Sequence, residues 1–142
     1  DTYSKKILFS FTYDYRPKKG KLSQQRRLYF VRGLIEGILV DCELNIDVIV
    51  IEKQFVDVMS RCCGAVESAI GLLNDGEYVY EQMSPAHWKK QLSGSGKLSK
   101  DETENYLRDN HFHAYDQLTD KSEHTLDALG MIFAYIKKHG IE

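Results

Sequence analysis

The chain has 142 residues, which is enough for a hydrophobic core, and we expect one domain over residues 1–142. No stretch reaches the roughly 20 apolar residues that a membrane-spanning helix needs, so we expect no membrane association. The net charge of −2 excludes no class of partner, because basic residues still gather at 16–21 and around 89–100. The three cysteines include no CxxC pair, which argues against structural zinc or a disulfide framework and favours a cytoplasmic protein.

The first half of the chain alternates predicted strands and helices. Period-two alternation with many aromatic residues indicates a strand, whereas apolar residues spaced by three and four indicate a helix. Four consecutive β-branched residues indicate a strand that is buried on both faces. The predicted elements are a strand over 5–15, a helix over 23–43, a strand over 48–51, a helix over 61–73 and a strand over 78–81.

The second half is predicted to be helical. Ser84-Pro85 has the residues typical of a helix start, and Ser99 with Glu102 forms a capping box for a helix over 100–110. A last helix is predicted to run from near Asp120 to Lys138, with a glycine after its end. Strands that alternate with helices predict an α/β fold, in which helices cover both faces of a sheet.

Glu52 is the first candidate site residue. It follows directly after the apolar strand over 48–51. Carboxylates are rarely fully buried without a partner, and ligand sites in open α/β sheets lie at the carboxyl ends of the strands. Glu52 is therefore expected to serve chemistry rather than packing.

His124 and Asp127 on the last predicted helix are the second candidates. They are three residues apart and so share one helix face, while Leu126 and Leu129 lie on the opposite side. Two acids and an imidazole suit Mg²⁺ or Mn²⁺, and two such ions about 4 Å apart promote phosphodiester hydrolysis. The alternative is a solvent-facing pair in the first turns of the helix, where an acid also suits the helix dipole.

Two segments resemble motifs of RuvC-type Holliday junction resolvases. IEKQF at 51–55 resembles the IEQxF segment of this family, and HTLDAL at 124–129 resembles its C-terminal (D/H)xxDAL motif. The helix over 61–73 resembles the helix that follows the catalytic strand, on the side of the dimer interface. HWKKQL at 87–92, with the Gly-Ser-Gly-Lys loop after it, resembles the basic, DNA-facing segment. The resemblance covers essentially the whole chain.

The resemblance implies an RNase H-like fold, a mixed sheet flanked by helices. It implies a homodimeric, metal-dependent endodeoxyribonuclease of DNA recombination and repair, which resolves four-way or branched DNA with two Mg²⁺ or Mn²⁺ ions. Glu52, His124 and Asp127 match the catalytic and metal-binding residues. Phe55 matches the aromatic residue that probes bases at the junction centre, by stacking on them. The expected phosphate contacts are Lys53, Lys89, Lys90, Lys97 and Lys100.

One feature of the family has no assigned counterpart. Its first catalytic Asp lies on the first strand, so far ahead of the central Glu that counting back from Glu52 reaches the start of this chain. The strand over 5–15 looks like the third strand of the family, and neither Asp1 nor Asp14 is assigned as the missing acid. We therefore expect the first strands to lie upstream. The alternatives are a catalytically incomplete branched-DNA-binding module and another RNase H-like nuclease, for example one that cuts RNA–DNA hybrids.

Overall fold

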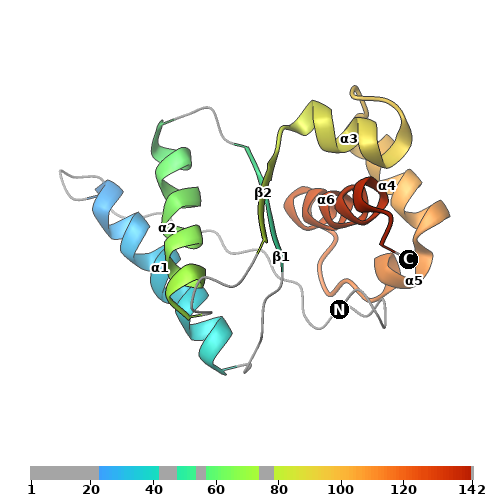
Figure 1. The fold of residues 1–142 in the computed structure, drawn as a ribbon. Coiled ribbons are helices and arrows are strands. Elements are labelled where there is room, and N and C mark those ends of the chain that lie inside the picture. The colour runs from blue at the N-terminus through green and yellow to red at the C-terminus, as the bar shows by residue number, and fades with distance from the viewer. Residues whose placement is uncertain (1–22, 42–47, 54–56, 74–78, 142) are drawn as a thin grey trace. The chain divides into compact units, whose positions relative to one another are not determined.

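The computed structural model describes residues 23–41, 48–53, 57–73 and 79–141, which belong to two compact units. Of the described residues, those up to Gln82 form the N-terminal unit, with two helices and a small sheet, and those from Met83 form the C-terminal unit, with four helices. In chain order the elements are α1 (Ser23–Asp41), β1 (Val48–Glu52), α2 (Asp57–Leu73), β2 (Val79–Met83), α3 (Pro85–Ser93), α4 (Lys100–Asn110), α5 (Phe112–Asp116) and α6 (Glu123–His139) (Figure 1).

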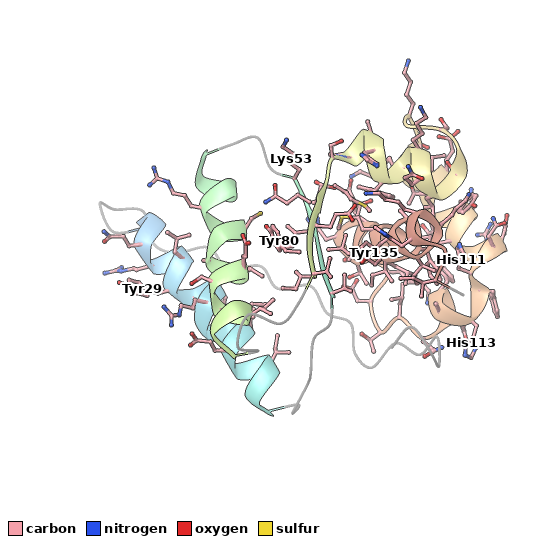
Figure 2. The ribbon with its side chains drawn as sticks, in the orientation of Figure 1. Tyr29, Lys53, Tyr80, His111, His113 and Tyr135 are labelled. Carbon is pink, nitrogen blue, oxygen red and sulfur yellow. The ribbon has the colours of Figure 1, made fainter. Side chains whose placement is uncertain are left out.

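In the described part of the N-terminal unit, β1 and β2 pair as two parallel strands, and α2 lies between them in the sequence. Helix α1 packs beside α2 (Figure 1). Ile49 of β1 and Ile70 of α2 are buried against each other. Tyr80 of β2, labelled in Figure 2, packs on this pair. The described part thus confirms helices packed on one face of the sheet, and the covering of the other face stays a prediction. The predicted strand over 5–15 lies outside the described residues.

Helix α2 begins at Asp57, four residues before the predicted start. Its pattern suggested burial on two sides, against the sheet and against another subunit. Val66 and Ile70 contribute to the core with the sheet, and α1 of the same chain also packs on α2. Ile35 of α1 packs against this same core, so burial against another subunit stays a prediction.

In the C-terminal unit, the helix ends follow their predicted signals. Ser84 Oγ accepts a hydrogen bond from the His87 N–H at 3.4 Å, with Pro85 in the first turn of α3. Gly140 ends α6 in the left-handed region, at φ 62°. These ends are local, so the sequence alone was sufficient to predict them.

The core of the C-terminal unit forms where α3 packs on α6. Trp88 of α3 is fully buried, together with Leu92 of the same helix and Leu129 and Ala134 of α6. The indole lies directly against the backbone of α6, because a Cβ atom on Gly130 would stand 2.7 Å from its Cζ3 atom. Gly130 thus provides the space that the indole fills. No helix among the described residues is long and apolar enough to span a membrane.

Two predictions for this unit were wrong. Helix α5 was not predicted, and α6 begins at Glu123 rather than near Asp120. The five-residue helix α5 is too short to show a periodic pattern. It follows His111, whose ring stacks on Phe133 of α6 with a centroid distance of 3.7 Å. Burial, and then the charge of Lys137, lower the pKa of His111.

The capping box of α4 gives a pH-dependent prediction. The Ser99 N–H donates to Glu102 Oε2 at 2.8 Å, and the Glu102 N–H donates to Ser99 Oγ at 3.3 Å. The hydrogen bond from the Ser99 backbone is the main cause that lowers the pKa of Glu102 below 4.5. Because the folded-state pKa is depressed, this stabilisation is present above pH 4.5 and is lost as the pH falls through the folded-state pKa.

Glu102→Gln is therefore expected to lower the free energy of unfolding at neutral pH, because a neutral amide accepts a weaker hydrogen bond from the Ser99 N–H than the carboxylate does. The deficit should shrink in acid, where Glu102 becomes neutral in the wild type as well. Thermal unfolding followed by circular dichroism at about pH 7 and pH 3.5 measures both effects. A deficit of the same size at the two pH values would contradict the role of the carboxylate.

Candidate functional site

Glu52 is the last residue of β1 and is half-buried. Side chains alternate along a strand, so Ile49 and Ile51, which pack toward α2, lie on the face opposite to Glu52. The carboxylate therefore projects away from the core between the sheet and α2. Lys53 follows with an exposed side chain at the end of β1 (Figure 2), and Phe55 lies outside the described residues.

His124 and Asp127 lie in the first two turns of α6, as predicted. His124 is exposed and Asp127 is half-buried, whereas Leu126 and Leu129 of the same turns are buried in the core. The helix thus separates a polar face from an apolar one. Residues three apart lie about 5–6 Å from one another at their Cβ atoms, which is close enough for joint contact with one ion.

A polar network that the sequence analysis did not predict fixes the start of α6. Ser122 caps the helix and accepts from the Thr125 N–H at 3.4 Å. The Asp120 carboxylate accepts from the Ser122 N–H at 2.6 Å and from Thr125 Oγ1 at 2.9 Å. Thr125 is buried. Asp120 therefore stands before the helix and holds the turn that carries His124.

Glu123, the first residue of α6, links this helix to α4. Glu123 forms an ion pair with Lys100, the first residue of α4. The hydrogen bond from Lys100 is the main cause that lowers the pKa of Glu123, and the positive charges of Lys100, His124 and Lys89 act in the same direction. Positive groups from α3 and α4 thus lie near the N-terminal turn of α6.

The predicted phosphate contacts in the C-terminal unit differ in their surroundings. Lys90 and Lys97 are exposed, and Lys100 is largely exposed despite its ion pair. Lys89 is half-buried, and its Nζ donates to the backbone oxygen of Leu98 at 2.9 Å. Sequence reasoning treated these lysines alike, because the contact of Lys89 depends on how the loop after α3 folds.

The structure does not bring the three metal-site candidates together within one unit. Glu52 belongs to the N-terminal unit, and His124 and Asp127 belong to the C-terminal unit. Among the described residues, no three His, Cys, Asp or Glu side chains are grouped so that they could hold a metal ion. The donor types nevertheless suit Mg²⁺ or Mn²⁺, and a common site stays a prediction.

Comparison with solved structures identifies the fold. The chain is similar to the structure of RuvC from Thermus thermophilus, with a TM-score of 0.65 and 17% sequence identity. The match covers 91% of this chain and 75% of the other. Comparisons of the sequence with protein-family models and with curated proteins found no match. At this identity the likeness establishes a RuvC-like fold, which agrees with the RNase H-like fold expected from the sequence.

Proposed function

We propose that this protein is a structure-selective endonuclease that cuts four-way or branched DNA by divalent-metal-dependent hydrolysis of a phosphodiester. The observation that carries the proposal is the pairing of a RuvC-like fold with two motifs in matching order. Glu52 ends a strand of the sheet, and His124 with Asp127 lies on one face of the last helix. This function implies a homodimer that acts in DNA recombination and repair, in the cytoplasm.

Glu52, Asp127 and His124 would hold the metal. A bound divalent ion supplies activation of water and stabilisation of the leaving oxygen. Two dications at close distance repel each other and need several negative charges nearby. The two carboxylates of Glu52 and Asp127 can neutralise one such ion but not two. The proposal of two ions, Mg²⁺ or Mn²⁺, therefore includes a further acid from another strand. Asp1 and Asp14, which the sequence left unassigned, both lie outside the described residues.

Binding to DNA would use basic residues of both units. The side chains of Lys53, Lys90 and Lys97 are exposed and suit phosphate contacts. Lys100 would contact phosphate through the donors that its pair with Glu123 leaves available. Phe55 would stack on unpaired bases at the junction centre. Salt-dependent binding to branched DNA is the expected signature.

A cleavage assay on matched substrates tests the function. We expect a labelled four-way junction to be cut with Mg²⁺ or Mn²⁺, and a linear duplex of the same arm sequence to be cut much less. Chelation of the metal should stop cleavage. Tight junction binding without cleavage would instead favour a DNA-binding module, which the unassigned first-strand acid motivates. Faster cleavage of an RNA–DNA hybrid than of the junction would indicate a different RNase H-like nuclease.

A further inference from the structure

The loop of residues 94–99, between α3 and α4, is tied to the end of α3 by a chain of hydrogen bonds. Ser93 Oγ donates to the backbone oxygen of Lys89 at 3.1 Å. The Ser95 N–H donates to Ser93 Oγ at 3.2 Å, and the Lys97 N–H donates to Ser95 Oγ at 3.4 Å. A sequence of glycines and serines that reads as a flexible linker thus has a defined path in the structure.

The same loop packs along α3 at two further points. A Cβ atom on Gly96 would stand 3.0 Å from the backbone oxygen of Ala86, so the middle of the loop lies against the first turn of α3. Near the end of the loop, the Leu98 backbone oxygen accepts a hydrogen bond from Lys89 Nζ at 2.9 Å. The same Nζ lies 5.3 Å from the centre of the Trp88 ring. Lys89 therefore joins α3 to the far end of the loop.

Lys89 and Lys90 are neighbours with the same charge but with different surroundings. Lys90 is exposed on α3, and Lys97 is exposed on the loop, so both amino groups face solvent. Lys89 is half-buried, with a donor used by Leu98 and its ammonium above Trp88. Leu98 takes one of the three donors of Lys89 Nζ and the side chain is half-buried, so Lys89 is less accessible to a phosphate than Lys90 is. Its charge is better used to satisfy a carbonyl and fix the loop.

We propose that Lys89 is a positioning residue, which holds the 94–99 loop against α3 and thereby presents Lys90 and Lys97 to the phosphates of DNA. The fixing of the loop by Lys89 is a property of the free protein. The presentation of Lys90 and Lys97 to DNA rests on the proposed function. Lys89 then affects DNA binding through the shape of the loop, whereas Lys90 and Lys97 act through direct contact.

Lys89→Met and Lys90→Met form a matched pair, since each removes one ammonium group and keeps an apolar stem. In the free protein, hydrogen exchange of the peptide covering residues 93–99 is expected to become about three- to tenfold faster in Lys89→Met, because one charged hydrogen bond is lost. Lys90→Met should leave it unchanged. Gly96→Val, which forces the loop away from Ala86, should accelerate exchange in the same peptide without removing a charge.

Junction binding measured at several salt concentrations separates the two roles. Lys90→Met and Lys97→Met should each reduce the slope of log K against log salt by about one. Gly96→Val and Lys89→Met should both weaken binding, and Gly96→Val does so with every lysine in place. The proposal is overturned if Lys89→Met leaves loop exchange unchanged and lowers the salt slope as Lys90→Met does. If the wild type binds no branched DNA, the DNA role of the loop fails together with the proposed function. Hydrogen exchange of the loop then still decides whether Lys89 fixes it.

Discussion

Glu52→Gln is expected to reduce cleavage of a four-way junction by about 10²–10³-fold, while junction affinity stays within about twofold of the wild type. Glutamine keeps the size and the hydrogen-bonding capacity of the side chain but removes the negative charge that a divalent ion requires. Glu52 is half-buried at the end of β1 and projects away from the core with α2, so the substitution leaves that core intact. Single-turnover cleavage and a binding assay in Ca²⁺ or without metal measure the two quantities separately.

A matched control comes from the same unit. Glu36 of α1 is an exposed carboxylate that pairs with Arg32 at 2.6 Å. Exposed pairs contribute about 0–1 kcal/mol, so Glu36→Gln should change neither cleavage nor stability by much. Cleavage that persists unchanged in Glu52→Gln, with Glu36→Gln alongside, would remove Glu52 from the catalytic site. Loss of cleavage together with loss of the folded state would require Glu52→Asp as a second test, because this substitution keeps the charge and should retain more activity.

The metal itself provides a readout that is independent of catalysis. If Glu52 and Asp127 share an ion, Mn²⁺ should raise the melting temperature of the wild type, since a ligand that binds only the folded state stabilises it. The increase should be lost in Glu52→Gln and in Asp127→Asn alike, although these residues belong to different units. An increase that survives one substitution and not the other would indicate an ion held within a single unit.

What the sequence predicted well is local. The start of α3 at Ser84-Pro85, the capping box of α4 and the end of α6 at Gly140 each depend on a few adjacent residues, and each was confirmed. The same holds for the polar face of α6, since spacing alone puts Asp127 three residues after His124. These features require no knowledge of the rest of the chain.

What the sequence did not predict depends on contacts between distant residues. The last helix was predicted to start near Asp120, but the Asp120 carboxylate instead accepts hydrogen bonds from Ser122 and Thr125 and stands before the helix. The sequence does not distinguish Lys89 from its neighbour Lys90. In the structure the Leu98 backbone oxygen accepts a hydrogen bond from Lys89. A contact over nine residues through a glycine-rich loop leaves no periodic signal.

Gly130→Ala is expected to destabilise the C-terminal unit by about 1–3 kcal/mol, although alanine is the better helix former. The added Cβ would stand 2.7 Å from Trp88 Cζ3, where a real contact is essentially never found. Trp88 is fully buried in the core of this unit, so it has little room to retreat. Because the chain holds one tryptophan, its fluorescence reports unfolding of this unit directly.

Control glycines show what the same substitution does without a neighbour. A Cβ on Gly33 in α1 or on Gly64 in α2 would meet nothing within 4 Å, so alanine there should stabilise by about 0.5–1 kcal/mol. The opposite sign at Gly130 would then report the contact with Trp88 rather than helix propensity. Equal stabilisation at Gly33 and Gly130 would show that the indole moves aside at little cost.

The contact itself is testable by a double-mutant cycle. Trp88→Leu removes the ring atoms that the new Cβ would meet and leaves a cavity in the core, so alone it should destabilise. In that background Gly130→Ala should be neutral or stabilising, with a coupling energy of about 0.5–3 kcal/mol measured by circular dichroism. Coupling near zero would place the strain elsewhere in α6. Coupling of the expected size would show that the contact with the indole of Trp88 is what requires a glycine at position 130.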